Sequence, residues 1–207
     1  MLIVLTLFVI FLILLINEVI SHKFTKNKEI KRKLMHIIIG VLTAFWPFYL
    51  SFMDIKLLAL AYLIVVVLSK RFNIFKAIHN VKRKSYGEEL FAISVGLLAF
   101  LTNNKWIFAV AILEMAIADG LAAIIGSKYG KSTSYHLLRQ TKSFLGNLSF
   151  FITSLVILLL VNQFSTLKLG IIQIVLVSVV TTIIEGISFF GLDDLFVPIV
   201  VFLMINH

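Results

Sequence analysis

The sequence contains no cysteine, and this absence excludes several kinds of chemistry. It leaves no disulfide framework, no thiolate nucleophile and no cysteine-ligated metal. Charged residues are also scarce, at 14% of the 207 residues, whereas 60% are hydrophobic and the mean hydropathy is +1.07. This composition, with apolar runs long enough to cross a bilayer, is typical of a polytopic membrane protein and gives no indication of a nucleic-acid partner.

The chain also lacks a soluble module, a detectable internal repeat and a low-complexity linker, so residues 1–207 are expected to form a single integral-membrane domain. The first apolar run, residues 1–16, has no basic residue before it and no small-residue cleavage site after it. We therefore interpret it as a retained membrane span and not as a signal peptide.

Apolar stretches predict an all-α transmembrane bundle of about seven to eight spans. They lie at about 1–20, 34–52, 55–69, 88–101, 106–127, 144–162, 167–187 and 195–206. The stretches 88–101 and 195–206 are short, because at ~1.5 Å per residue they cover less than the ~30 Å hydrocarbon core. Either could be tilted, extended by its flanks, or re-entrant.

Basic residues predict the topology. The loops 21–33, 70–87 and 128–143 hold 16 of the 19 lysines and arginines, which places these loops in the cytoplasm and both termini outside. The net charge of +9 fits this rule and an attraction to anionic lipid. Within the second loop, residues 72–84 are expected to form an amphipathic helix on the cytoplasmic interface, where it serves as a surface anchor.

The acidic residues are less easily explained by topology. Eight of the ten fall at or near the cytoplasmic side, so acids and bases gather on one face, as a site for metal and phosphate requires. Glu114 and Asp119 lie inside a predicted span. An ionisable side chain there is energetically costly, so we expect each acid to be paired with another polar group or to have a function. Glu88 and Glu89 begin a helix; capping explains one of them, and a supporting role in the site is possible for the other.

The segment from Gly126 to Asn147 has the composition of a phosphate-binding loop. The spacing Gly126-x-x-x-Gly130 alone would be weak, because helix packing also favours it. Glycines let backbone N–H groups approach an anion, and nearby basic and polar side chains neutralise it. The segment is not a P-loop. Its candidate phosphate ligands are Gly126, Lys128, Gly130, Lys131, Arg139, Lys142, Ser143, Gly146 and Asn147.

Two further clusters fall on the same face of the membrane. Arg32 and His36, with Lys33 beside them, enter the second span on a face that also carries Gly40. A histidine at this position is either an ordinary interface residue whose hydrogen bonds are all made, or one that contacts phosphate or transfers a proton. Near the end, Glu185 closes a span, Gly191 permits a turn, and Asp193 and Asp194 precede a short helix. Paired carboxylates beside a turn suit Mg²⁺.

In this order the segments "RKLMHIIIG" with the later "WP", "SYGEELF", "ADGLAAIIGSKYGK", "TKSFLGN" and "EGISFFGLDDLFVP" resemble the CTP-dependent lipid kinases. That family includes dolichol, phytol and CTP-using diacylglycerol kinases and is distantly similar to CDP-diacylglycerol synthases. Two positions depart from it: Asn147 stands where a serine is common, and Asp194 where an asparagine is common.

The resemblance implies transfer of the γ-phosphate of CTP to the hydroxyl of an isoprenoid alcohol or diacylglycerol. It implies catalytic roles for Asp119, His36 and Lys142. It also implies Mg²⁺ at Asp119, Glu185, Asp193 and Asp194, and nucleotide contacts from Arg32, Lys33 and the glycine-rich segment. Glu88, Glu89 and Glu114 would support the site. The alternatives are a cytidylyltransferase that makes a CDP-lipid and, from another class, a small ion-coupled transporter. The choice of lipid alcohol and the formation of a homodimer are left open.

Overall fold

The computed structural model describes residues 3, 6–10, 12, 28–72, 86–137 and 140–206, and most of them are helical. The elements before the hairpin are α2 (Lys28–Ala44), η1 (Trp46–Phe48), α3 (Phe52–Arg71), α5 (Gly87–Leu101), α6 (Lys105–Leu113), the π-helix η2 (Glu114–Ala118), α7 (Asp119–Tyr129) and η3 (Gly130–Thr133). They are followed by β1 (Ser134–Leu137), β2 (Gln140–Ser143), α8 (Phe144–Phe164), α9 (Ile171–Ile187) and α10 (Asp193–Ile205).

Three helices are long and apolar enough to cross a membrane: Phe52–Arg71, Lys105–Thr133 and Phe144–Phe164. They confirm apolar helices where we predicted spans at 55–69, 106–127 and 144–162. The other predicted spans in the described ranges are helices of at most 17 residues, so the count of seven to eight stays a prediction. Most of the predicted first span at 1–20, and all of the predicted amphipathic helix at 72–84 beyond Phe72, lie outside the described residues.

The all-α prediction was wrong for one segment, since residues 134–137 and 140–143 form two paired antiparallel strands, called the hairpin below. Ser134 pairs with Ser143, and Leu137 pairs with Gln140. Tyrosine and threonine favour strands, and burial alternates along β1. The hairpin is tied to the bundle by Tyr135, whose hydroxyl donates to the Gly186 carbonyl oxygen at 3.0 Å.

A second difference concerns the helix that carries the first basic cluster. We predicted a span from residue 34, but α2 begins at Lys28, six residues earlier. Lysine, glutamate and arginine are good helix formers, so the basic segment continues the helix instead of forming a loop. Arg32 and Lys33 therefore have helical positions fixed relative to His36, one turn or less further on.

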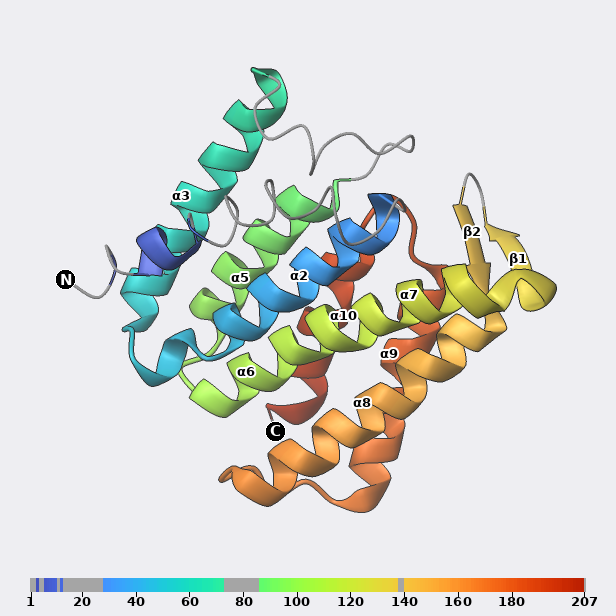
Figure 1. The fold of residues 1–207 in the computed structure, drawn as a ribbon. Coiled ribbons are helices and arrows are strands. Elements are labelled where there is room, and N and C mark those ends of the chain that lie inside the picture. Colours follow the sequence, from blue (N-terminus) through green and yellow to red (C-terminus); the bar gives the residue numbers. More distant parts are fainter. Residues whose placement is uncertain are drawn as a thin grey trace.

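The bundle packs α2 closely against α6, η2 and α7, which together hold Glu114 and Asp119 (Figure 1). A Cβ atom at Gly40 would collide with the Ala116 side chain, and one at Gly120 would collide with the Ile37 side chain. These two glycines let α2 approach η2 and α7. Behind them α10 contacts α5, α6, η2 and α9, while α8 packs against α7 and α9 packs against α8 and α10.

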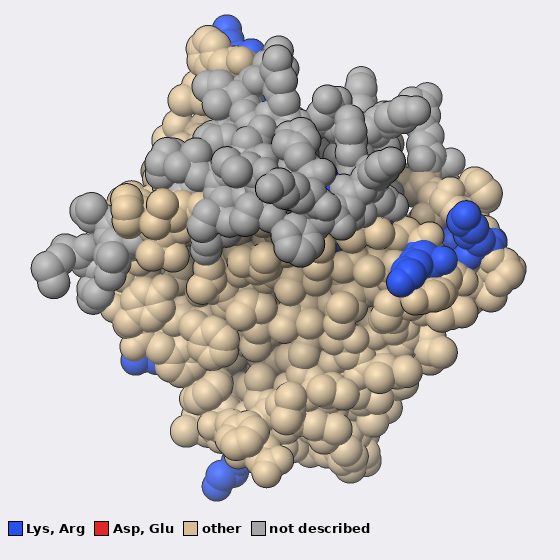
Figure 2. Space-filling model, in the orientation of Figure 1, with Lys and Arg blue, Asp and Glu red and all other residues tan. Residues whose placement is uncertain are grey.

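The chain reverses between α9 and α10 through Phe190 and Gly191, which have φ values of 55° and 91°. The predicted turn at Gly191 is therefore confirmed. It places Asp193 and Asp194 in the first turn of α10, about 100° apart around the helix. In Figure 2 the described part of the visible face is largely uncharged, with lysines and arginines at its margins and no Asp or Glu in view.

Candidate active site

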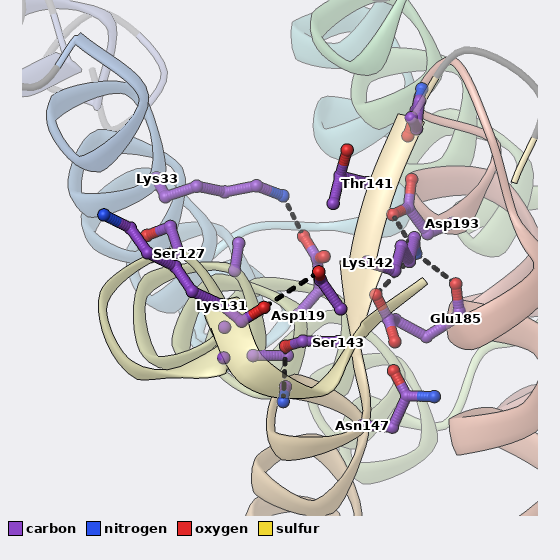
Figure 3. A pocket seen from close by; sticks show the side chains of 17 residues that line it. Lys33, Asp119, Ser127, Lys131, Thr141, Lys142, Ser143, Asn147, Glu185 and Asp193 are labelled. Carbon is purple, nitrogen blue, oxygen red and sulfur yellow. Dashed lines mark hydrogen bonds and ion pairs between the residues drawn. The ribbon is translucent and has the colours of Figure 1, made fainter. Parts of the chain in front are cut away.

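A pocket of about 510 Å³ opens between α7, the hairpin and the first turn of α8, with α2 on one side and the α9–α10 turn on the other (Figure 3). It brings together residues from eight elements: α2, α7, η3, β1, β2, α8, α9 and α10. Of the residues predicted from the sequence, it is lined by Lys33, Asp119, Gly126, Gly130, Lys131, Lys142, Ser143, Gly146, Asn147, Glu185 and Asp193. The pocket therefore gathers basic, acidic and glycine residues that lie more than 150 positions apart in the chain.

Asp119 lies at the base of this pocket and is only 2% exposed. It is the first residue of α7, directly after the π-helical turn, an element often found at functional sites. Lys33 Nζ donates to Asp119 Oδ2, and His36 Nε2 lies 3.8 Å from the same oxygen. A buried carboxylate is thus matched by a buried lysine, which lowers the cost of holding each charge away from water.

A second acid–base group faces Asp119 across the pocket. Lys142 Nζ lies 2.5 Å from Glu185 Oε1 and 3.6 Å from Asp193 Oδ2, and it also donates to the Glu185 carbonyl oxygen. Burial disfavours the charged form of Lys142, but the two carboxylates outweigh burial and hold the lysine pKa above its ordinary value. Lys142 therefore remains a cation at neutral pH.

The acids form two groups with the spacing of metal ligands, and Asp119 belongs to both. One group is Asp119, Glu185 and Asp193; the other is His36, Asp119 and Asp194. Within each group the potential ligand atoms lie within 4.8 Å of one another. Glu185 Oε2 is buried and has no hydrogen-bond partner among the described residues. A set of three carboxylates with an unused buried oxygen fits Mg²⁺, which prefers oxygen ligands.

The opposite wall of the pocket is shaped by glycines around Ser143. A Cβ atom at Gly126 would lie 2.8 Å from Ser143 Oγ, and one at Gly130 would collide with the same side chain. Ser143 caps α8, accepting a hydrogen bond from the Gly146 N–H at 3.0 Å. The first turn of α8 thus lines the pocket with its electropositive end, which favours an anion. Lys131, exposed, stands at the rim.

Seven other predicted residues in the described ranges do not line the pocket, and five of them do not take part in its acid clusters. Glu88 and Glu89 pair with Lys70, at 3.3 and 2.6 Å. Glu114 is fully buried, and Lys128 is exposed beside the Tyr129 ring. Arg32 lies one position from Lys33, which faces the pocket in its place.

His36 and Asp194 adjoin Asp119 from the side away from the pocket. His36 Nε2 lies 3.3 Å from Asp194 Oδ1 and 3.2 Å from the Met115 carbonyl oxygen. Asp193 therefore belongs to the group around Lys142, whereas Asp194 belongs to the group around His36. Arg139 lies outside the described residues.

Four polar residues of the lining were not singled out from the sequence: Ser127, Ser134, Gln140 and Thr141. Three of them belong to the hairpin, and because the segment was interpreted as a loop, its strand faces were not considered. The tyrosine and threonines of "STSYHLLRQTKS", which favour strands, are the signal that could have indicated these faces, although four-residue strands are too short for a clear alternation.

Comparison with known proteins gives one strong similarity. The chain is 32% identical over 200 residues to a phytol kinase from Synechocystis sp., and the alignment covers 90% of this chain and 82% of that protein. No protein-family model matches the chain, and no solved structure matches it. Because the identity extends over nearly the whole sequence, the chain belongs to the phytol kinase family and is a membrane lipid kinase, a phosphotransferase.

Proposed function

We propose that this kinase transfers the γ-phosphate of CTP to the hydroxyl group of an isoprenoid alcohol in the membrane. The observation that carries the proposal is the arrangement of three carboxylates and three lysines around one pocket, opposite a glycine-lined wall and the start of a long helix. Phytol is the first alcohol to test, because the similar protein is named a phytol kinase. CTP is the donor implied by the resemblance of the sequence segments.

The triphosphate would lie between the glycine wall and the lysines. Lys131 and Lys142 would contact phosphate oxygens from two sides, and the backbone near Gly146 and Asn147 would add N–H donors. Lys33 and Lys142 now neutralise Asp119 and Glu185. When the nucleotide binds, both lysines can turn from a carboxylate to a phosphate without leaving the pocket. Lys128 and Arg139 would assist from the rim of the loop.

Asp119, Glu185 and Asp193 would hold Mg²⁺, with Asp194 close to the same carboxylate cluster. When bound, this ion neutralises charge on the phosphate oxygens. Asp119 would orient the acceptor hydroxyl and accept its proton as the alcohol oxygen forms a bond to the γ-phosphorus and the bond to CDP breaks. Catalysis of this kind depends mainly on positioning and charge neutralisation.

His36 has a narrower part in this mechanism. Three acceptor oxygens surround its Nε2, those of Met115, Asp194 and Asp119. Such an environment favours the tautomer in which Nε2 carries the proton, so His36 donates to the Met115 carbonyl oxygen and keeps its N–H close to both carboxylates. It would hold Asp119 in place while that residue contacts the substrate.

The predicted topology places this pocket at the cytoplasmic side of the membrane. Lys131 and Lys142 belong to the predicted cytoplasmic loop 128–143, and the nucleotide would enter from that side. The acceptor hydroxyl lies at the bilayer interface when its chain is in lipid. The buried carboxylates therefore stand where a soluble nucleotide and a membrane alcohol can meet.

The test uses purified protein in detergent with Mg²⁺ and CTP labelled in turn at the γ- and α-phosphate. Phytol, a polyprenol, diacylglycerol and phosphatidate are offered separately. Label that moves from the γ-position to phytol or the polyprenol supports the proposal. Label that moves only from the α-position to phosphatidate identifies a cytidylyltransferase and overturns it. No transfer from either position overturns CTP as the donor, and ATP is then tested in the same way.

A further inference from the structure

Gln140 places a buried side-chain amide in the wall of the candidate pocket. It is the first residue of β2, lines the pocket, and is only 6% exposed. Its Nε2 is buried and has no hydrogen-bond partner among the residues that the structure describes. A buried donor without a partner is costly and rare in folded proteins, so it needs an explanation. Because Gln140 lines the pocket, a ligand bound there can supply the missing acceptor.

The hairpin holds Gln140 in a fixed position. Gln140 pairs with Leu137 at the end of the two strands. On the partner strand, the Tyr135 hydroxyl donates to the Gly186 carbonyl oxygen at 3.0 Å and lies 3.0 Å from Asn147 Nδ2, which donates to it. The hairpin is therefore tied to both α8 and α9. A side chain carried by such a rigid element is suited to fixing the orientation of a ligand.

Gln140 lies beyond the proposed phosphate contacts along β2. Alternate residues of a strand face the same side, so Gln140 and Lys142 share one face of β2, roughly 7 Å apart. Lys142 is paired with Glu185, and the next residue, Ser143, faces the glycine wall. From Ser143 to Gln140, β2 therefore leads away from the phosphate end of the pocket. A nucleotide whose phosphates lie at that end can extend its base toward Gln140.

The chemistry of a neutral amide suits a base better than a phosphate. A glutamine side chain presents a donor NH₂ group and an acceptor oxygen side by side, but it carries no charge to neutralise a phosphate. The edge of cytosine carries the complementary pair, since ring nitrogen N3 is an acceptor and the adjacent 4-amino group is a donor. Glutamine and asparagine recognise such a pair on a base by two parallel hydrogen bonds.

We propose that Gln140 recognises the base of the nucleotide donor, with Nε2 donating to cytosine N3 and Oε1 accepting from the 4-amino group. The inference rests on the proposed function, because it assigns a specificity-determining residue for that function's nucleotide. The unpaired buried N–H is then a cost of the free protein that is relieved when the base binds. A site built to hydrogen-bond a ligand group discriminates against a ligand that lacks it.

The first test compares a nucleotide with a ligand that has phosphates but no base. Calorimetry on the whole protein in detergent with Mg²⁺ gives Kd for CTP and for inorganic tripolyphosphate. Gln140→Leu removes both polar atoms with little change in size. Gln163→Leu is the matched control, because Gln163 is exposed on α8 and does not line the pocket.

For Gln140→Leu we expect Kd for CTP to rise about tenfold and Kd for tripolyphosphate to change by less than about twofold, because only the base loses hydrogen bonds. Gln163→Leu should leave both values unchanged. Without ligand, the Tm of Gln140→Leu should not fall, because leucine leaves no buried donor unpaired. Equal weakening of both ligands, an unchanged Kd for CTP, or a Tm well below that of wild type overturns the base contact.

A second measurement changes the ligand and not the protein. Pyrimidin-2-one riboside triphosphate keeps the N3 atom of CTP and lacks its 4-amino group. Wild type should bind this analogue about fivefold to tenfold more weakly than CTP, and Gln140→Leu should bind the two equally. Equal affinities in wild type, with γ-phosphate still transferred from CTP, overturn the base contact alone. If wild type binds CTP no more tightly than tripolyphosphate and transfers no phosphate from it, CTP as the donor is wrong as well.

Discussion

Replacing Asp119 with asparagine distinguishes a catalytic carboxylate from a structural one. The variant removes the charge that neutralises buried Lys33 and removes a member of both metal-ligand groups. Two unit charges in contact attract by about 4 kcal/mol at an effective dielectric constant of about 20, and loss of one partner of a buried pair costs about 3 kcal/mol or more. For a chain of this size, that cost equals a fall in Tm of about 6–12 °C.

The double variant Lys33→Met/Asp119→Asn makes the test decisive. It leaves no unpaired charge, so most of the lost stability should return in a thermal melt in detergent. Turnover with phytol and CTP should remain at least about 10³-fold below wild type in both variants, since no other group replaces the carboxylate. Near-normal turnover in Asp119→Asn, or recovery of turnover with stability in the double variant, would refute a catalytic role.

Three further outcomes follow from the pocket. Gly130→Ala should raise the KM for the nucleotide and lower the free energy of unfolding by about 1–3 kcal/mol, because the new Cβ atom collides with Ser143. Gly170→Ala is the control, because a Cβ atom at Gly170 would meet nothing within 4 Å. Equal effects of the two variants would contradict the packing argument. The raised pKa of Lys142 means that its ion pairs contribute full stability below its ordinary pKa of 10.5 and lose it as pH rises through the raised value. The Tm difference between wild type and Lys142→Met should therefore be constant from about pH 7 to 9 and shrink only in strong alkali; a decline near neutral pH would disagree. Finally, CTP with Mg²⁺ should raise the Tm of wild type, because a ligand at a hundredfold excess over Kd stabilises the folded state by about 2.7 kcal/mol. The Tm of Asp119→Asn should rise much less. Equal shifts of Tm in the two proteins would exclude Asp119 from the binding site.

Much of the candidate site was predictable from residue types and their order. The glycines at 126, 130 and 146 and the acids at 119, 185 and 193 line one pocket, as their chemistry suggested. Local periodicity also located the apolar helices. It did not predict the hairpin, because four-residue strands are too short to show a clear alternation, and their pairing depends on contacts such as that of Tyr135 with Gly186.

The sequence by itself determined that this is a membrane protein with two acids inside a long apolar run, because the hydrophobic effect acts on every apolar run and the cost of burying charge makes acids rare there. Only the tertiary structure decided which neighbour of a pair enters the site. Lys33 rather than Arg32 faces Asp119, because close packing at Gly40 and Gly120 fixes the rotation of α2. Asp193 faces Lys142 while Asp194 faces His36, because consecutive helical residues point about 100° apart. Amino-acid composition cannot show which of two adjacent residues faces the site. The packing of helices that are distant in the sequence determines it.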